Sequence, residues 1–310
     1  MSELKYVFGP VPSRRMGRSL GISPIPKKTC NYSCVYCQLG RTNKMTNKRE
    51  EYFSLEDILS EFDFHHNEDS YDVITIVGEG EPTLYSRLGE LIKEIKKRSN
   101  KPVAVITNGA LLYDESVRKE LMNADIVLPS LDSYNEEMFK KVDRPYGRIK
   151  FEEVWQGLLD FTKEYKGQIY MEIMLMNGIN DDEKSLFEFK NLLNQIRYDR
   201  LYINTPVRPP AESYIEESSK ESIQKAVEIL KGVSIDMLSS VGFSSDIEDD
   251  YQAVLSIIGR HPMNQFEIRS FLESRENEDI DKVMQQLNQD DNVCKMEYKG
   301  YCTYLSLIHI

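Results

Sequence analysis

The chain has 310 residues and a net charge of −12, with 40% hydrophobic and 29% charged residues. This apolar content can build a sizeable core, which excludes a disordered chain, and the acidic balance argues against general affinity for nucleic acid. No apolar run approaches the roughly 20 residues of a membrane-spanning helix, and the N-terminus lacks the hydrophobic region of a signal peptide. We therefore expect a cytoplasmic protein with one large α/β unit and an appendage.

Charge is distributed unevenly along the chain. Residues 1–50 carry ten Lys or Arg and two acidic residues, so this segment is +8 and the remainder is −20. A basic segment places positive potential around any site that it borders. The basic segment indicates an anionic substrate or a negatively charged redox partner. The alternative is that its charges serve only the solubility of the protein.

Residues 6–26 are too rich in proline and glycine for a helix, so we expect a loop that leads into a first strand near residues 18–23. Arg14 and Arg15 are adjacent in this loop. Two arginines on a stiff loop suit bidentate recognition of phosphate or carboxylate. An equally good alternative to a binding role is that these arginines lie at the surface and donate hydrogen bonds to backbone carbonyls.

Three of the five cysteines, Cys30, Cys34 and Cys37, lie within eight residues. Their spacing lets one short loop direct three thiolates at one metal centre in a reducing compartment. Thiolates select zinc or iron-sulfur clusters, but a structural zinc site needs a fourth protein ligand, and the next histidines are His65 and His66. A 4Fe-4S cluster on three cysteines keeps one iron open. A zinc knuckle or a chance group of buried thiols is the alternative.

From residue 54 onward, helical and strand patterns alternate along the chain. Such alternation predicts right-handed βαβ units and a parallel sheet, and six strands suit a partial (β/α)6 barrel. The strands are expected at residues 18–23, 71–77, 103–107, 125–129, 169–176 and 201–204. The helices are expected at residues 54–64, 87–98, 114–122, 135–142, 151–165, 182–195 and 220–230, the first capped by a serine at position 54.

Polar or glycine-containing segments follow five of these strands. In a barrel of this kind the carboxyl ends of the strands and the loops after them carry the site. Glycines there allow the backbone to approach a ligand closely, and amides, hydroxyls and carboxylates can bind a polar cofactor. The segments are residues 78–83, 107–109, 130–132, 177–181 and 204–210.

The cysteine motif, with the aromatic Tyr36 before its last cysteine, resembles the signature of the radical S-adenosylmethionine (radical SAM) superfamily, over about residues 6–212. The resemblance implies a 4Fe-4S cluster on Cys30, Cys34 and Cys37, with the amino and carboxylate groups of SAM on the open iron. One electron from a flavodoxin- or ferredoxin-type reductant would then cleave SAM to methionine and a 5′-deoxyadenosyl radical, which abstracts a substrate hydrogen. The cofactors would supply the chemistry and the protein the binding and orientation.

The resemblance also implies roles for residues at the strand ends. The run from Gly78 to Pro82 is similar to the superfamily's Gly-Gly-Glu-Pro motif, which receives the methionine amino group, with Glu79 in place of the first glycine. Positions after the next two strands match contacts to the ribose and the methionyl carboxylate, and the last segment matches the region beside the adenine. The implied cofactor-binding residues are Tyr36, Gly78, Gly80, Glu81, Pro82, Thr107, Asn108, Ser130, Asp132, Asn204, Thr205 and Val207.

Within the superfamily, residues 8–15, 37–42, 80–84 and 204–210 resemble a branch grouped with the wyosine-tRNA synthases. Two departures weaken the transfer of that activity. The tRNA enzymes carry further cysteines for a second cluster, and none precedes Cys30 here. They also need a broadly basic surface, whereas this chain is acidic outside residues 1–50.

Residues 232–250 are rich in Ser, Gly and Asp and indicate a linker between domains of residues 1–231 and 251–310. We expect helices at residues 251–258, 264–273 and 280–288 and strands at 293–298 and 301–307, which is a winged-helix pattern. A DNA-binding winged helix needs a basic recognition helix, but the third helix offers one lysine, Lys282. We therefore expect a peptide or protein partner and no DNA.

Other residues are expected to be structural. Cys294 and Cys302, on the two C-terminal strands, would face one another as packed thiols or bind a second metal. Trp155 is expected in the core, and His261 and His309 as structural or surface residues. Four histidines, none beside a plausible nucleophile, argue against acid-base hydrolysis.

Three functions remain open from the sequence. The first is a radical SAM enzyme, its oxidoreductase, transferase or lyase class undetermined, acting on a peptide or protein that the C-terminal domain recruits. The second is a radical SAM enzyme that modifies a tRNA base, with the basic N-terminal segment on the phosphates. The third is a non-enzymatic iron-sulfur sensor coupled to the C-terminal domain.

Overall fold

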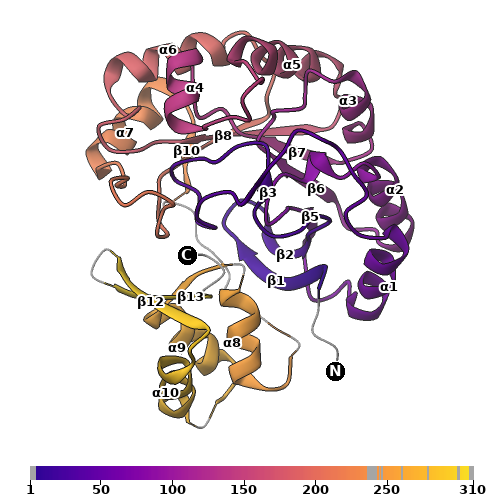
Figure 1. Cartoon of the computed structure of the whole chain (residues 1–310), viewed down its shortest axis with the longest axis vertical. Helices are drawn as coiled ribbons and strands as arrows, with labels where there is room; N and C mark the ends of the chain where they lie inside the picture. The colour runs from indigo at the N-terminus through magenta and orange to yellow at the C-terminus, as the bar shows by residue number, and fades with distance from the viewer. Residues whose placement is uncertain are drawn as a thin grey trace.

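The computed structural model describes residues 5–235, 243, 245, 247–259, 261–277, 279–298 and 301–306 (Figure 1). A large sheet with helices around it occupies the N-terminal part, and a smaller unit of helices and strands follows it. Figure 1 shows the smaller unit beside β1 (Val7–Ser13). No described helix combines the length and apolar character needed to cross a membrane. His309 and residue 307 lie outside the described residues.

The central sheet has eight strands in the order β1-β2-β5-β6-β7-β8-β9-β10. Neighbouring strands are parallel from β2 to β10, and β1 pairs antiparallel with β2. The further strands are β2 (Gly17–Ile22), β5 (Val73–Ile76), β6 (Val103–Thr107), β7 (Ile126–Pro129), β8 (Gln168–Met174), β9 (Arg200–Asn204) and β10 (Val233–Ser234). The predicted α/β fold with a parallel sheet is confirmed.

Two strands of this sheet were not predicted. The loop expected from residue 6 is instead the strand β1, which tolerates prolines because it lies at the sheet edge and its ladder is interrupted by a register shift between Phe8 and Val11. At the opposite edge, Val233 and Ser234 of the predicted linker pair with β9 as β10. A two-residue strand leaves no periodic signal that the sequence could show.

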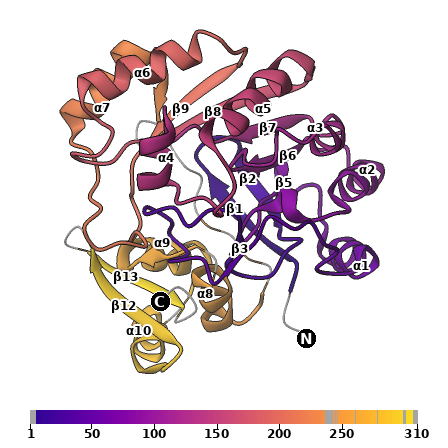
Figure 2. The same cartoon turned by 45° about the horizontal axis from the view of Figure 1, so that its top comes forward.

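Most of the helices follow an arc around the sheet, as Figures 1 and 2 both show. They are α1 (Leu55–His65), α2 (Leu88–Arg98), α3 (Glu115–Leu121), α4 (Glu136–Val142), α5 (Phe151–Glu164), α6 (Glu183–Leu193) and α7 (Lys220–Leu230), each within a few residues of its predicted range. The predicted cap of α1 is present, since Ser54 Oγ accepts the Asp57 N–H at 3.3 Å. Trp155 packs partly buried against the main core.

The smaller unit contains α8 (Asp250–Ile258), β11 (Met263–Asn264), α9 (Gln265–Ser274), α10 (Ile280–Gln289), β12 (Val293–Tyr298) and β13 (Tyr301–Ser306). Its three strands form an antiparallel sheet in the order β11-β13-β12, and the short β11 was not predicted. It has its own apolar core, which includes Val254, Phe271 and Leu287.

The two cysteines of this unit do not face one another. Cys294 pairs with Leu305 across the hairpin, whereas Cys302 pairs with Glu297. Because Cys294 and Glu297 are three positions apart in one strand, their side chains lie on opposite faces of the sheet. Cys302 packs against the core of the unit and Cys294 does not share its face, so the expected pair of packed thiols is wrong.

Candidate functional site

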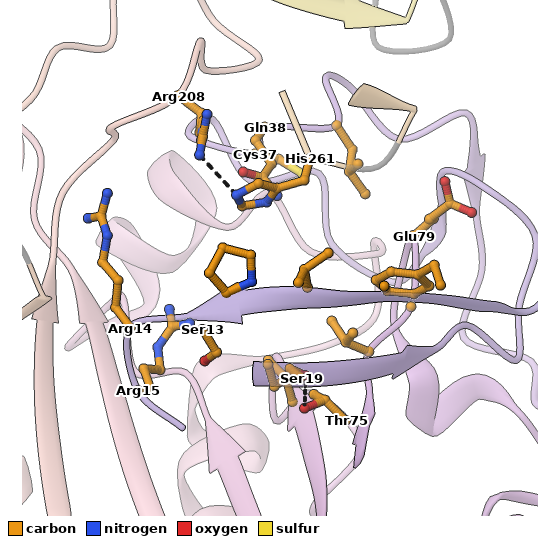
Figure 3. A pocket seen from close by; sticks show the side chains of 18 of the residues that line it. Ser13, Arg14, Arg15, Ser19, Cys37, Gln38, Thr75, Glu79, Arg208 and His261 are labelled. Carbon is orange, nitrogen blue, oxygen red and sulfur yellow. Dashed lines mark hydrogen bonds between the residues drawn. The ribbon is translucent and has the colours of Figure 1, made fainter. Parts of the chain in front are cut away.

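The three clustered cysteines lie on one loop that begins at β3 (Thr29–Cys30), a short strand parallel to β4 (Lys44–Met45). The loop is fixed by backbone hydrogen bonds, from Cys37 N to Cys34 O at 3.1 Å and from Val35 N to Val142 O at 2.9 Å. All three thiols are free, and all three line one cavity of about 480 Å³. The cavity lies where the strand ends and the β1–β2 hairpin meet (Figure 3).

The loop after β5 packs directly on the cysteine loop. Lys28 N donates to Glu79 O at 2.6 Å, and Glu81 N donates to Thr29 O at 3.1 Å. Gly80 lies at the crossing, where an added Cβ would meet Thr29 O at 1.8 Å. Only glycine permits this contact between two backbones. The glycine in this motif is therefore required by the approach of the cysteine loop itself.

Glu81 organises the strand ends rather than standing free in the cavity. Its carboxylate accepts the Thr107 hydroxyl at 2.6 Å, the Asn108 N–H at 2.8 Å, and the Thr83 hydroxyl at 2.6 Å and N–H at 3.0 Å. Burial raises the pKa of Glu81, and these hydrogen bonds lower it. Glu81 thereby links the loops after β5 and β6, and Pro82 follows it as the first residue of the 3-10 helix η1 (Pro82–Leu84).

Asn108 connects this network with the first cysteine. Its side-chain amide lies 2.8 Å from Asn31 Oδ1 and 3.6 Å from Cys30 Sγ, and donates to both. The backbone N–H of Tyr32 also donates to Cys30 Sγ, at 3.4 Å. Donors of this kind stabilise a cysteine thiolate that binds metal.

Asp132 lies behind the cavity wall. One carboxylate oxygen accepts the hydroxyl of Tyr36, and the other accepts the Met174 N–H at 2.7 Å. Burial raises the pKa of both Asp132 and Tyr36 well above their usual values. Tyr36 lines the cavity and Asp132 does not, so the structure gives Asp132 contact with Tyr36 where the sequence predicted contact with a cofactor.

The structure brings most of the other predicted residues to the cavity. The remaining wall residues from the prediction are Gly78, Gly80, Glu81, Thr107, Asn108, Ser130, Asn204, Thr205 and Val207. They come from the ends of β5, β6, β7 and β9, which are neighbours or near neighbours in the sheet. Pro82 does not line the cavity.

Several wall residues were missed. Glu172, in the middle of β8, forms an ion pair with Arg15 and accepts a hydrogen bond from Asn204 Nδ2 at 3.2 Å. A lone carboxylate within an apolar strand was a signal that could have found it. Arg208 and His261 also line the cavity, where the sequence predicted His261 only as a structural or surface residue.

The C-terminal unit forms part of the same wall through Ser256, Ile257, His261 and Glu267. Arg208, on the loop after β9, donates to both oxygens of Glu267 at 2.8 and 3.1 Å and to His261 Nε2 at 2.9 Å. Burial lowers the pKa of Arg208, and Glu267 raises it. This ion pair joins the two parts of the chain at the cavity.

The donor set fits a thiolate-bound cluster. Cys30, Cys34 and Cys37 share one loop, face one cavity and receive hydrogen-bond donors at Cys30. Burial raises the pKa of all three thiols, so metal binding would release their protons. Across the described ranges, no group of three or more His, Cys, Asp and Glu side chains is arranged to hold a single metal ion.

Comparison with known proteins defines the class. A model of the radical SAM superfamily matches residues 25–189, and the chain belongs to that superfamily. Its members are enzymes that use a 4Fe-4S cluster and SAM, and membership of the superfamily gives this chain the same two cofactors.

Particular relatives match along most of the chain. A UPF0026 protein of Methanocaldococcus jannaschii is 34% identical over 317 residues, which cover 98% of this chain and 97% of that protein. A radical SAM methyltransferase from Sphaerobacter thermophilus shares the fold with a TM-score of 0.54 at 15% identity, over 71% of this chain and 68% of that one. SuiB of Streptococcus suis, solved with bound S-adenosylmethionine, has a TM-score of 0.51 at 14% identity, over 70% and 47% of the two chains.

Proposed function

We propose that Cys30, Cys34 and Cys37 hold the 4Fe-4S cluster, that SAM binds in the adjoining cavity, and that the enzyme takes a hydrogen atom from a substrate in that same cavity. This proposal rests on one observation: the three thiols and the loop from Gly78 to Glu81 line the same cavity. A volume of about 480 Å³ is within the usual range of small-molecule sites. When bound, the cofactors supply reductive cleavage of SAM and a 5′-deoxyadenosyl radical.

The residues around the cavity have distinct proposed roles. The backbone of the loop from Gly78 to Glu81, which lines the cavity beside the cysteines, would receive the methionine end of SAM. Asn108 would stabilise the Cys30 thiolate with its amide. Tyr36, held by Asp132, would fix one wall. The side chains at the ends of β6, β7 and β9 would receive the ribose, carboxylate and adenine: Thr107, Ser130, Asn204, Thr205 and Val207.

The C-terminal unit is proposed to be of winged-helix type and to contact the substrate. Its element order, with β11 paired to β13, supports the first part, and its side chains on the cavity wall support the second. The acidic start of α10 favours a peptide or protein partner over DNA for the outer face of this unit. A tRNA base, as in the wyosine-like branch, is the second candidate substrate, and the arginines on the cavity wall favour it.

A one-electron reductant of flavodoxin or ferredoxin type and a cytoplasmic location complete the proposal. The positive charge of residues 1–50, which contain the cysteine loop, supports an anionic donor protein. Arg41 and Lys48 are exposed beside that loop, although each also pairs with a glutamate.

The experiment uses anaerobically reconstituted full-length protein with dithionite and SAM, and measures 5′-deoxyadenosine by chromatography. We expect 5′-deoxyadenosine from the parent protein and none from Cys34→Ala. Cys302→Ala is the matched control, because Cys302 packs against the core of the C-terminal unit and does not line the cavity. A protein that takes up iron and sulfide but leaves SAM intact would favour the iron-sulfur sensor instead.

A further inference from the structure

One end of the cavity is enclosed by arginines from two parts of the chain. Arg14 and Arg15 lie on the turn between β1 and β2, and Arg208 lies on the loop after β9. Figure 3 shows Arg14 and Arg15 on one side and Arg208 with His261 on the other. Two carboxylates face this end, Glu172 and Glu267, each of which holds one guanidinium in an ion pair. The result is a site lined by three guanidinium groups.

The turn that carries Arg14 and Arg15 is rigid. Ser13 pairs with Gly17, so three residues close the hairpin, and Gly17 has the left-handed φ of +80° that such a turn requires. Met16 N donates to Ser13 O at 3.4 Å, and the backbone carbonyl of Arg15 accepts the Tyr202 hydroxyl at 3.3 Å. The backbone that carries the two arginines is therefore positioned before any ligand arrives, and the ion pair with Glu172 also holds the Arg15 side chain, which lowers the cost of binding.

Three guanidinium groups face two carboxylates here, which leaves this end of the cavity with an excess of positive charge. Arg208 is largely withdrawn from water, its side chain 11% exposed, and the charge of Arg14 lies near enough to lower its pKa further. The Nε–H of Arg15 is buried and, within the described part of the chain, has no hydrogen-bond partner. A buried charged donor left without an acceptor is unfavourable. An anion between the two walls would offset this cost.

We propose that this end of the cavity is a phosphate subsite for the substrate, with Arg14 as its main contact, supported by Arg15 and the Ser13 hydroxyl and closed by the Arg208 wall. A tetrahedral phosphate presents oxygens to both walls, whereas a planar carboxylate presents two oxygens along one edge. The Arg208 terminal nitrogens already bond Pro262 O, Glu267 and His261, so Arg208 positions the wall and adds to the potential. This inference rests on the proposed function, because it assigns a substrate class to the same cavity.

The test is isothermal titration calorimetry of the full-length protein, as purified, with inorganic phosphate at constant ionic strength. We expect saturable binding, weakened at least about tenfold in Arg14→Ala, since a charge-assisted hydrogen bond is lost. Arg14→Lys keeps the positive charge but loses the planar guanidinium group, so its affinity for phosphate should lie between those of the parent protein and Arg14→Ala. The control is Arg18→Ala, which removes the same charge from β2 at a residue that pairs with Asp72 outside the cavity.

Several results would overturn the inference. They are the absence of saturable phosphate binding, equal binding by Arg14→Ala and the parent protein, an equal loss in Arg18→Ala, and acetate binding as tight as phosphate. Unfolding in urea checks that each variant is folded. If Arg14→Ala is not folded, the comparison of Arg14→Lys with the parent protein replaces it.

Two further titrations assign the source of the phosphate. A mononucleotide that binds as tightly as a short single-stranded RNA assigns it to a small phosphate ester. Much tighter RNA binding with a steep salt dependence assigns it to a polynucleotide. Confirmation of the subsite favours a phosphate-bearing substrate over the peptide or protein of the proposed function, and the absence of phosphate binding favours the peptide or protein. Because phosphate binding needs neither the cluster nor SAM, this test can fail while SAM cleavage succeeds.

Discussion

The crossing of the two loops at Gly80 makes the sharpest structural prediction. Gly80→Ala places a Cβ 1.8 Å from Thr29 O and 2.7 Å from Thr29 C, and both are backbone atoms that cannot turn away. The two loops must separate. The hydrogen bonds from Lys28 N to Glu79 O and from Glu81 N to Thr29 O are the contacts at risk.

The magnitude follows from these contacts. Two backbone hydrogen bonds contribute about 1 kcal/mol each, and forcing an extra carbon into a packed site costs about 1–3 kcal/mol. We expect Gly80→Ala to lower the free energy of unfolding by about 3–5 kcal/mol, the sum of these effects. Because Thr29 precedes Cys30, we also expect less iron bound per chain after reconstitution.

The assay is urea unfolding of the cluster-free protein, followed by iron and sulfide analysis after reconstitution. The matched control is Gly147→Ala, because Gly147 is exposed and an added Cβ there meets no atom within 4 Å. It should unfold within about 0.5 kcal/mol of the parent. If Gly80→Ala matched the parent in both stability and iron content, the close contact of the two loops would be refuted.

Three further predictions concern other charged groups of the site. Glu81→Gln turns one acceptor oxygen into a donor that faces other donors, so it should lower the free energy of unfolding by about 1–3 kcal/mol, measured from urea midpoints. Glu79→Gln should lower it by less, and equal effects of the two changes would contradict the hydrogen-bond network of Glu81. Glu267→Gln leaves Arg208 buried without its carboxylate, and because the Glu267 side chain is 28% exposed we expect a loss of about 1–3 kcal/mol, below the full-burial value; an unchanged urea midpoint would contradict it. Hydrogen bonds from Arg41 and Arg144 lower the pKa of Glu212 to about 2, so Glu212 stabilises the fold fully above its unfolded pKa of about 4.5 and loses this effect as pH falls toward about 2. The free energy of unfolding of Glu212→Gln should therefore fall less steeply with pH than that of the parent between about 4.5 and about 2, and an unchanged pH dependence would refute the pairing.

The sequence predicted the parts of the site that depend on local pattern. The spacing of Cys30, Cys34 and Cys37 and the glycines after β5 are visible in any reading of the chain, and the parallel sheet brings the strand ends to one edge. From these two facts the common cavity follows. The edge strand β1 was missed because its prolines argue against a strand, although an edge position tolerates them.

The rest depends on contacts between residues that are far apart in the chain. Arg208 contacts Glu267 and His261 only because the C-terminal unit packs beside the strand ends at the cavity, and no local sequence pattern predicts that packing. Asp132 follows a strand end, as the other site residues do, yet it bonds the Tyr36 hydroxyl from behind the wall. Which way a side chain turns at a strand end is decided by its neighbours in space.

The most direct test of the account is electron paramagnetic resonance of the reconstituted, dithionite-reduced protein, recorded with and without SAM. A 4Fe-4S cluster on three cysteines has one iron open to SAM, so we predict a spectrum that changes when SAM is added and that is absent from Cys34→Ala. A cluster spectrum that SAM leaves unchanged would contradict the central claim, because it would mean that no iron is open to the cofactor in this cavity.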